Sequence, residues 1–113
     1  MNLETLQEVV IDRCDSYKFI VANVTDDNDN SKLVVRVNNH YAIHAEILFI
    51  LREEVRPLGL KACCIGGGRI EINPEAKTIR IWDKSTGFGE EPDRQQTIRM
   101  LQAAYPEFQV GER

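Results

Sequence analysis

Residues 61–72 read KACCIGGGRIEI, and they combine the character of a β-strand with a feature that weakens one. The apolar residues on both sides of the glycines are typical of a buried strand. Three consecutive glycines, Gly66, Gly67 and Gly68, weaken a strand because they add backbone entropy and pack no side chain. Arg69 follows them directly. We therefore expect either a bulge or turn here, or a close approach of the backbone to another group.

The segments before this stretch predict a hairpin. YKFIVANVT (17–25) and KLVVRVN (32–38) are rich in β-branched and aromatic residues, which favours strands. The polar DDNDNS (26–31) predicts the loop between them, and it lacks the glycine and the distal glutamate of a calcium-binding loop. LQEVVID (6–12) is compatible with a short helix and with a strand.

Two segments have the period of a helix. Apolar residues at positions 43, 47, 50, 51, 55 and 58 predict a helix that Pro57 and Gly59 end. PDRQQTIRMLQAAYP (92–106) predicts a second helix, with Pro92 or Asp93 near its start.

The remaining segments complete the predicted order of elements. NPEAK (73–77) predicts a turn, and TIRIWDK (78–84) predicts a strand with Ile79 and Ile81 facing inward. STGFGEEPD (85–93) predicts a loop, and EFQV (107–110) a last short strand. Hairpins combined with two helices indicate an α+β sandwich, in which helices pack on a mostly antiparallel sheet.

The size and charge of the chain indicate one globular domain over residues 1–113. A net charge of −4 without any run of basic residues argues against non-specific nucleic-acid binding, which requires clustered cations. The longest apolar stretch, AIHAEILFIL, has about 10 residues, roughly half of the ~20 that a membrane-spanning helix needs. We therefore expect no nucleic acid and no membrane as a partner.

The cysteines and the first residues favour a cytoplasmic protein. Cys14, Cys63 and Cys64 are odd in number, and the start MNLETLQEVV lacks the features of a secretory signal, so we expect reduced thiols. Neighbours on a strand face opposite ways, so Cys63 and Cys64 are unsuited to share a metal. His40 and His44 are spaced as in HExxH, but HYAIH has tyrosine in place of the glutamate. We expect no metal and no cofactor.

His44 is the candidate general base. It lies near the amino end of the first predicted helix, where the helix dipole disfavours the imidazolium. A neutral imidazole in a partly buried place can accept a proton. The alternative is a histidine that makes only a structural hydrogen bond.

Two glycine-rich segments and two cations are candidates for binding an anion. Glycines let backbone N–H groups approach an anion closely, and Arg69 adds a planar fork that matches phosphate. STGFG (85–89) offers two hydroxyls, two glycines and free amides ahead of a helix. Lys18 is a cation in an otherwise apolar strand. Turn glycines and an outward-facing lysine remain the alternatives, because the sequence does not show that these groups meet.

Together these features resemble the protein histidine phosphatase (janus/ocnus) family over about residues 17–110. The residues that carry the resemblance are YKFIV, HAEI, CCIGGGRI, TIRIWDKS leading into TGFG, and AAYPEFQV. The resemblance implies a small α/β sandwich with a six-stranded mixed sheet and two helices. It also implies a metal-independent hydrolase of protein phosphohistidine, whose partners are a histidine-phosphorylated protein or peptide and phosphate. We expect the protein to be a monomer.

The resemblance also assigns roles to residues. The histidine of the HA[DE] motif, His44, is the implied catalytic base. The implied phosphate-binding groups are Lys18, Arg69, Ser85, Thr86 and Gly87, with Gly66, Gly67 and Gly68 as pocket backbone.

Two positions depart from the family pattern. Ile43 stands where members often have tyrosine, and Asp93 stands near a place where they often have histidine. The acidic stretch EEPD (90–93) would then flank an anion pocket. These departures leave the phosphate-binding residues intact but keep an alternative function open, a non-catalytic module that binds phosphate or phosphoproteins in the same pocket and regulates a partner.

Overall fold

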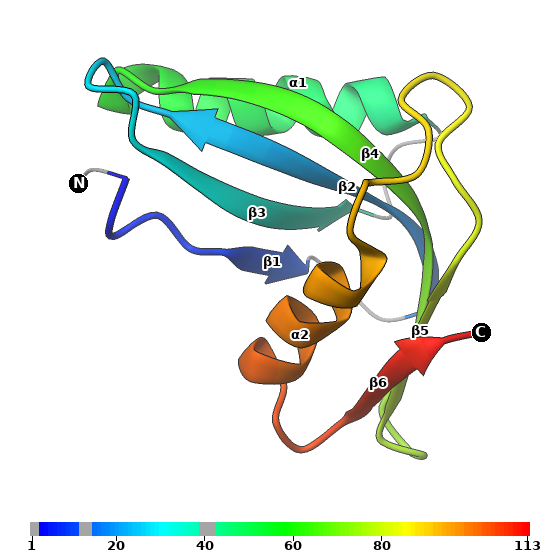
Figure 1. The fold of residues 1–113 in the computed structure, drawn as a ribbon. Helices are drawn as coiled ribbons and strands as arrows, with labels where there is room; N and C mark the ends of the chain where they lie inside the picture. The colour runs from blue at the N-terminus through cyan, green and yellow to red at the C-terminus, as the bar shows by residue number, and fades with distance from the viewer. Residues whose placement is uncertain (1–2, 12–14, 39–42) are drawn as a thin grey trace.

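The computed structural model describes residues 3–11, 15–38 and 43–113, and within them it has an α+β fold (Figure 1). The chain order is β1 (Val9–Ile11), β2 (Asp15–Thr25), β3 (Ser31–Asn38), α1 (His44–Val55), a 3-10 turn (Arg56–Leu58), β4 (Lys61–Asn73), β5 (Thr78–Trp82), α2 (Arg94–Ala104) and β6 (Gln109–Glu112). The predicted fold class is thereby confirmed.

The six strands form one mixed sheet in the order β1-β3-β2-β4-β5-β6. The four central strands pair antiparallel, while β1 runs parallel to β3 and β6 runs parallel to β5 at the two edges. The long strands β2 and β4 curve together through the centre of the sheet (Figure 1). The mostly antiparallel character expected from the hairpin pattern is therefore correct.

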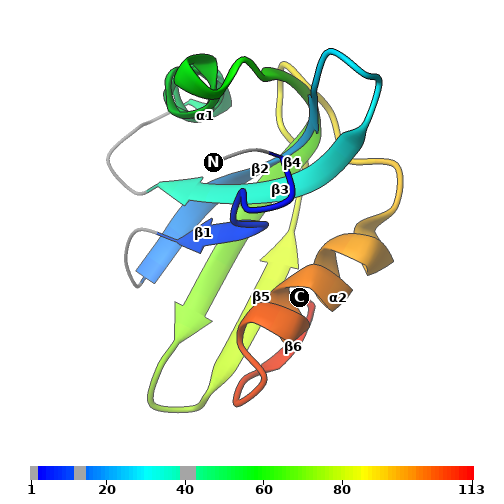
Figure 2. The same cartoon turned by 90° about the vertical axis from the view of Figure 1, so that its left-hand side faces the viewer.

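The two helices cover opposite faces of the sheet (Figure 2). Because side chains alternate along a strand, β2 supplies a core to each face. Its residues Ile20 and Val24 pack in the cluster that contains α1, whereas Phe19 and Val21 pack in the cluster that contains Met100 and other residues near α2. Both faces of the central strand are buried, which explains its nearly continuous apolar sequence.

Several element boundaries differ from the sequence prediction. The ambiguous 6–12 segment contains strand β1, and the last strand lies two residues later than predicted. Strand β5 ends at Trp82 rather than residue 84, because Asp83 adopts a left-handed conformation with φ of 68°. Within the described part of the chain, no helix is long and apolar enough to span a membrane.

A β-bulge interrupts β4 at the glycines. Val21 pairs with Gly66 and the next residue of β2, Ala22, pairs with Cys64, so Ile65 is an extra residue in β4. Gly66 has a φ of 152°, and a Cβ added there would lie closer than 3.0 Å to backbone atoms of Glu91. The bulge expected from the sequence is confirmed.

Gly67 and Gly68 are required by close packing. A Cβ on Gly67 would lie closer than 3.0 Å to the Phe19 carbonyl and 3.2 Å from Cδ2 of His44. A Cβ on Gly68 would lie 2.5 Å from the carbonyl oxygen of Trp82. The glycines thus allow the loop after β5 and the start of α1 to approach β4 from opposite faces.

Replacing Gly66 with alanine should therefore destabilise the fold, whereas Gly111→Ala should not. The Gly66 variant combines an unfavourable φ with overlap against Glu91, and we expect it to lose about 3 kcal/mol of unfolding free energy. A Cβ on Gly111 would meet its nearest atom at 3.8 Å, an ordinary contact. Urea unfolding of both variants measures the difference, and equal stability of the two would contradict the bulge.

Candidate functional site

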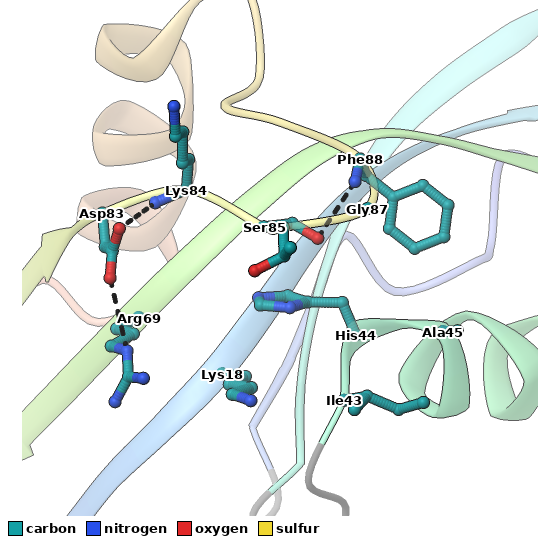
Figure 3. Close-up of a pocket in the computed structure, with 11 residues that line it drawn as sticks. Lys18, Ile43, His44, Ala45, Arg69, Asp83, Lys84, Ser85, Gly87 and Phe88 are labelled. Carbon is teal, nitrogen blue, oxygen red and sulfur yellow. Dashed lines mark hydrogen bonds and ion pairs between the residues drawn. The ribbon is translucent and has the colours of Figure 1, made fainter.

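A cavity of about 620 Å³ lies where α1 begins, between the strands β2 and β4 and the loop that follows β5 (Figure 3). The structure brings together in its lining six of the residues that the sequence singled out: Lys18, His44, Arg69, Ser85, Thr86 and Gly87. Its other lining residues are Ile43, Ala45, Asp83, Lys84 and Phe88. Residues from four separate segments of the chain therefore meet at one place.

Lys18 and Arg69 lie directly opposite each other on the paired strands β2 and β4. Both side chains line the cavity. Lys18 lies on the same face of β2 as Ile20, which packs in the core beneath α1. Like charges in this position repel each other, which disfavours the sheet. An anion bound beside both cations would attract each of them and offset this repulsion. The pair is therefore suited to an anion site.

Asp83 holds the Arg69 side chain from one edge. Its Oδ2 lies 3.4 Å from Nε of Arg69, and its Oδ1 accepts a hydrogen bond of 2.8 Å from the Lys84 amide. This contact uses the Nε edge of the guanidinium and leaves its two terminal nitrogens for a second anion. Sequence reasoning missed Asp83, because it extended the strand through residue 84. Asp is, however, one of the residues that tolerate a positive φ.

His44 is the first residue of α1, and its side chain is buried. Its Nε2 lies 2.9 Å from the carbonyl oxygen of Gly68. A carbonyl can only accept, so Nε2 donates and the lone pair of the neutral ring lies on Nδ1. The histidine therefore has one nitrogen fixed to the fold and one able to take a proton.

Burial lowers the pKa of His44 below its ordinary value of 6.5, and the charges of Lys18 and Arg69 lower it further. The hydrogen bond to Gly68 and the charge of Asp83 act in the opposite direction without reversing the shift. A pKa below 6.5 keeps the ring mostly neutral at pH 7.

The loop at 85–89 is held closed by its own hydrogen bonds. The amide of Gly89 donates to the carbonyl of Ser85 over 2.8 Å, and Oγ of Ser85 accepts from the amide of Phe88 over 3.2 Å. The amides of Thr86 and Gly87 donate to none of the described residues. Within this loop, those two amides remain for an anion in the cavity.

The three glycines do not line the cavity, contrary to our expectation that they form pocket backbone. The amide of Gly67 donates to the carbonyl of Gly89, and the carbonyl of Gly68 accepts from His44. Gly66 packs against Glu91. The three glycines lie behind the lining residues. Because they have no side chains, the lining residues can approach one another closely.

No residue of the acidic stretch 90–93 is part of the cavity lining. Glu91 is buried and accepts from Arg94 Nη2 over 2.7 Å and from Thr97 Oγ1 over 2.6 Å. Asp93 caps α2 by accepting from the amide of Gln96. The departure from the family pattern at Asp93 therefore lies outside the cavity lining.

Arg94 was not predicted from the sequence, and it supports the site from behind. It is buried, and it donates to the carbonyls of Asp83 over 2.7 Å and Gly67 over 3.2 Å. Arg94 and Thr97 are three residues apart on α2, but Glu91 precedes the helix, so helical spacing does not identify the group.

Among the described residues, no group of three or more His, Cys, Asp or Glu side chains could hold a metal ion. Cys63 and Cys64 are free thiols, and Cys63 is exposed. His40 and Cys14 lie outside the described residues.

Comparison with known proteins gives consistent matches. The model of the Janus/Ocnus family matches residues 3–109. Sex-regulated protein janus-A of Drosophila yakuba is 43% identical over 94 residues, which cover 83% of this chain and 69% of that protein. Janus-A of Drosophila pseudoobscura pseudoobscura is 34% identical over 114 residues, covering 96% and 76%. Janus-B of Drosophila sechellia is 39% identical over 84 residues, covering 70% and 56%.

The imidazole of His44 should titrate with a midpoint below pH 6.5 in an NMR pH titration. Because the chain has two histidines, the His44→Gln variant assigns the signal. Arg69→Met removes a positive charge beside the ring and should raise the midpoint, whereas Arg99→Met on α2 should leave it unchanged. A midpoint at or above 6.5 in the unaltered protein would contradict the described environment.

Proposed function

Because the chain belongs to the Janus/Ocnus family, we propose that it is a metal-independent protein phosphohistidine phosphatase in which His44 is the general base. The observation that carries the proposal is the hydrogen bond from Nε2 of His44 to the Gly68 carbonyl. It leaves Nδ1 as a proton acceptor in a cavity that Lys18 and Arg69 also line. The sequence motifs that resemble the protein histidine phosphatases support the same activity.

The reaction needs one water molecule and no covalent enzyme intermediate. The water oxygen attacks phosphorus while its proton passes to Nδ1 of His44. The P–N bond breaks, its electron pair stays on the imidazole nitrogen of the substrate, and that nitrogen takes a proton from solvent. The products are inorganic phosphate and an unmodified histidine, and His44 then returns its proton to solvent.

The remaining lining residues stabilise charge on the phosphoryl oxygens. The terminal nitrogens of Arg69 and the ammonium of Lys18 supply positive charge from the sheet. The amides of Thr86 and Gly87 supply hydrogen-bond donors from the opposite loop. The two amides belong to a hydrogen-bonded loop and need little reorganisation during the reaction, which makes their stabilisation effective.

Removal of the base should suppress turnover of a phosphohistidine peptide. We expect His44→Ala and His44→Gln each to lower kcat by about 10²- to 10⁴-fold, the usual contribution of general base catalysis. Glutamine can still donate to the Gly68 carbonyl but cannot take a proton, so it separates the chemical role from the structural one. Turnover near that of the unaltered protein in His44→Gln would refute the assignment.

The same assay, run with excess chelator over many turnovers, separates the enzyme from the alternative function. Sustained release of phosphate supports a metal-independent phosphatase. Saturable binding of the peptide without turnover would instead favour the non-catalytic module that binds phosphoproteins.

Arg69→Met should weaken the binding of inorganic phosphate. Loss of a charge-assisted hydrogen bond is worth about 1.5–3 kcal/mol, or roughly 10- to 100-fold in affinity. Arg99→Met, which removes the same charge from the exposed side of α2, is the matched control and should change the affinity little. Amide NMR titration with phosphate measures both, and equal affinities would count against the anion site.

A further inference from the structure

The cavity has two chemically different sides, one on each side of the His44 ring (Figure 3). Lys18, Arg69, Asp83 and Lys84 form the charged side, and Ile43, Ala45 and Phe88 form the apolar side. Building on the proposed function, we propose that the apolar side binds an apolar side chain next to the phosphorylated histidine in the substrate. Ile43 is then a residue that determines substrate specificity.

Within the described part of the chain, no contact or helix-capping role requires an isoleucine at position 43. It occupies the N-cap of α1, where it makes no side-chain hydrogen bond, and isoleucine is among the least favourable residues for that position. Its side chain is 53% exposed, so it also contributes little to the core. A partly exposed apolar group that serves neither the helix nor the core is available to contact a ligand.

Phe88 belongs to the loop after β5 and lies on the same apolar side of the cavity as Ile43 (Figure 3). Its amide donates to Oγ of Ser85, and its half-buried ring packs against the core cluster beneath α1. Ala45 follows His44 in the first turn of α1 and adds a small exposed side chain. Together with Ile43 these side chains make an apolar surface that adjoins the proposed phosphate site.

The size of the cavity also points to more than a phosphoryl group. Cavities of roughly 300–1,000 Å³ hold ligands of the size of a drug molecule. At about 620 Å³, this one exceeds the needs of a phosphoryl group on one imidazole ring. The remaining space lies within a lining that includes both apolar and charged groups, which suits a peptide residue beside the modified one.

The test compares two peptides that differ only beside the phosphohistidine, with leucine on both sides in one and serine on both sides in the other. Binding is measured in the His44→Gln background, so that turnover does not consume the peptides. We expect the leucine peptide to bind about 10-fold more tightly. Ile43→Ser should reduce this ratio to about one, and Phe49→Ser should preserve it. Phe49 is the matched control, since it is 60% exposed on the same helix but outside the cavity lining.

A loss of selectivity in the Ile43→Ser variant would not be caused by loss of folding. Serine is a preferred N-cap residue, so the variant should be at least as stable to urea as the parent protein. Equal affinity for the two peptides, or the same loss of selectivity in Phe49→Ser, would overturn the proposal.

The outcome can be separated from that of the proposed function. If the unaltered protein binds the peptides without releasing phosphate, the phosphatase proposal fails. The ratio between the two peptides, measured on that protein, still decides whether the apolar side selects its ligand.

Discussion

The hydrogen bond from His44 to the carbonyl of Gly68 is the contact on which the arrangement of the site depends. It joins the first residue of α1 to the middle of β4, and it determines which ring nitrogen carries the proton. Two adjacent glycines serve this one ring, since Gly67 leaves space beneath it and Gly68 supplies the acceptor. A side chain at Gly67 would displace the ring of His44. The position of the base therefore depends on both glycines.

The two arginines beside the site have different energetic roles. Arg94 and Glu91 are buried, and breaking a buried ion pair costs roughly 3–5 kcal/mol, so this pair belongs to the fold. The side chains of Arg69 and Asp83 are 55% and 47% exposed, and surface pairs are worth only about 0–1 kcal/mol. Arg69 can therefore turn to a bound anion at little cost, while Arg94 keeps the surrounding backbone in place.

The sequence was sufficient for the features that depend on local pattern. Alternating and helical periods located the central strands and both helices, and the motifs identified six residues of the cavity lining. It was not sufficient for features that depend on distant parts of the chain or lie outside a regular period. The left-handed Asp83 ended a strand early, Glu91 turned toward Arg94 rather than the cavity, and the glycines packed behind the lining. The packing of the glycines against Phe19 and Glu91, and the hydrogen bond from Arg94 to Gly67, join distant segments and are not revealed by local pattern. The turn at Asp83 and the Glu91–Arg94 pair are local, but neither belongs to a regular strand or helix period.

The extra residue in β4 also reverses which side chains face each helix. Before it, Ala62 belongs to the core beneath α1, whereas after it Ile70 and Ile72 belong to the core near α2, although all three have even numbers. A strand with uninterrupted alternation would therefore direct Arg69 to the opposite face from His44. The one extra residue shifts the alternation of side chains along β4 by one position. Because of this shift, the guanidinium of Arg69 and the imidazole of His44 lie on the same face of the sheet.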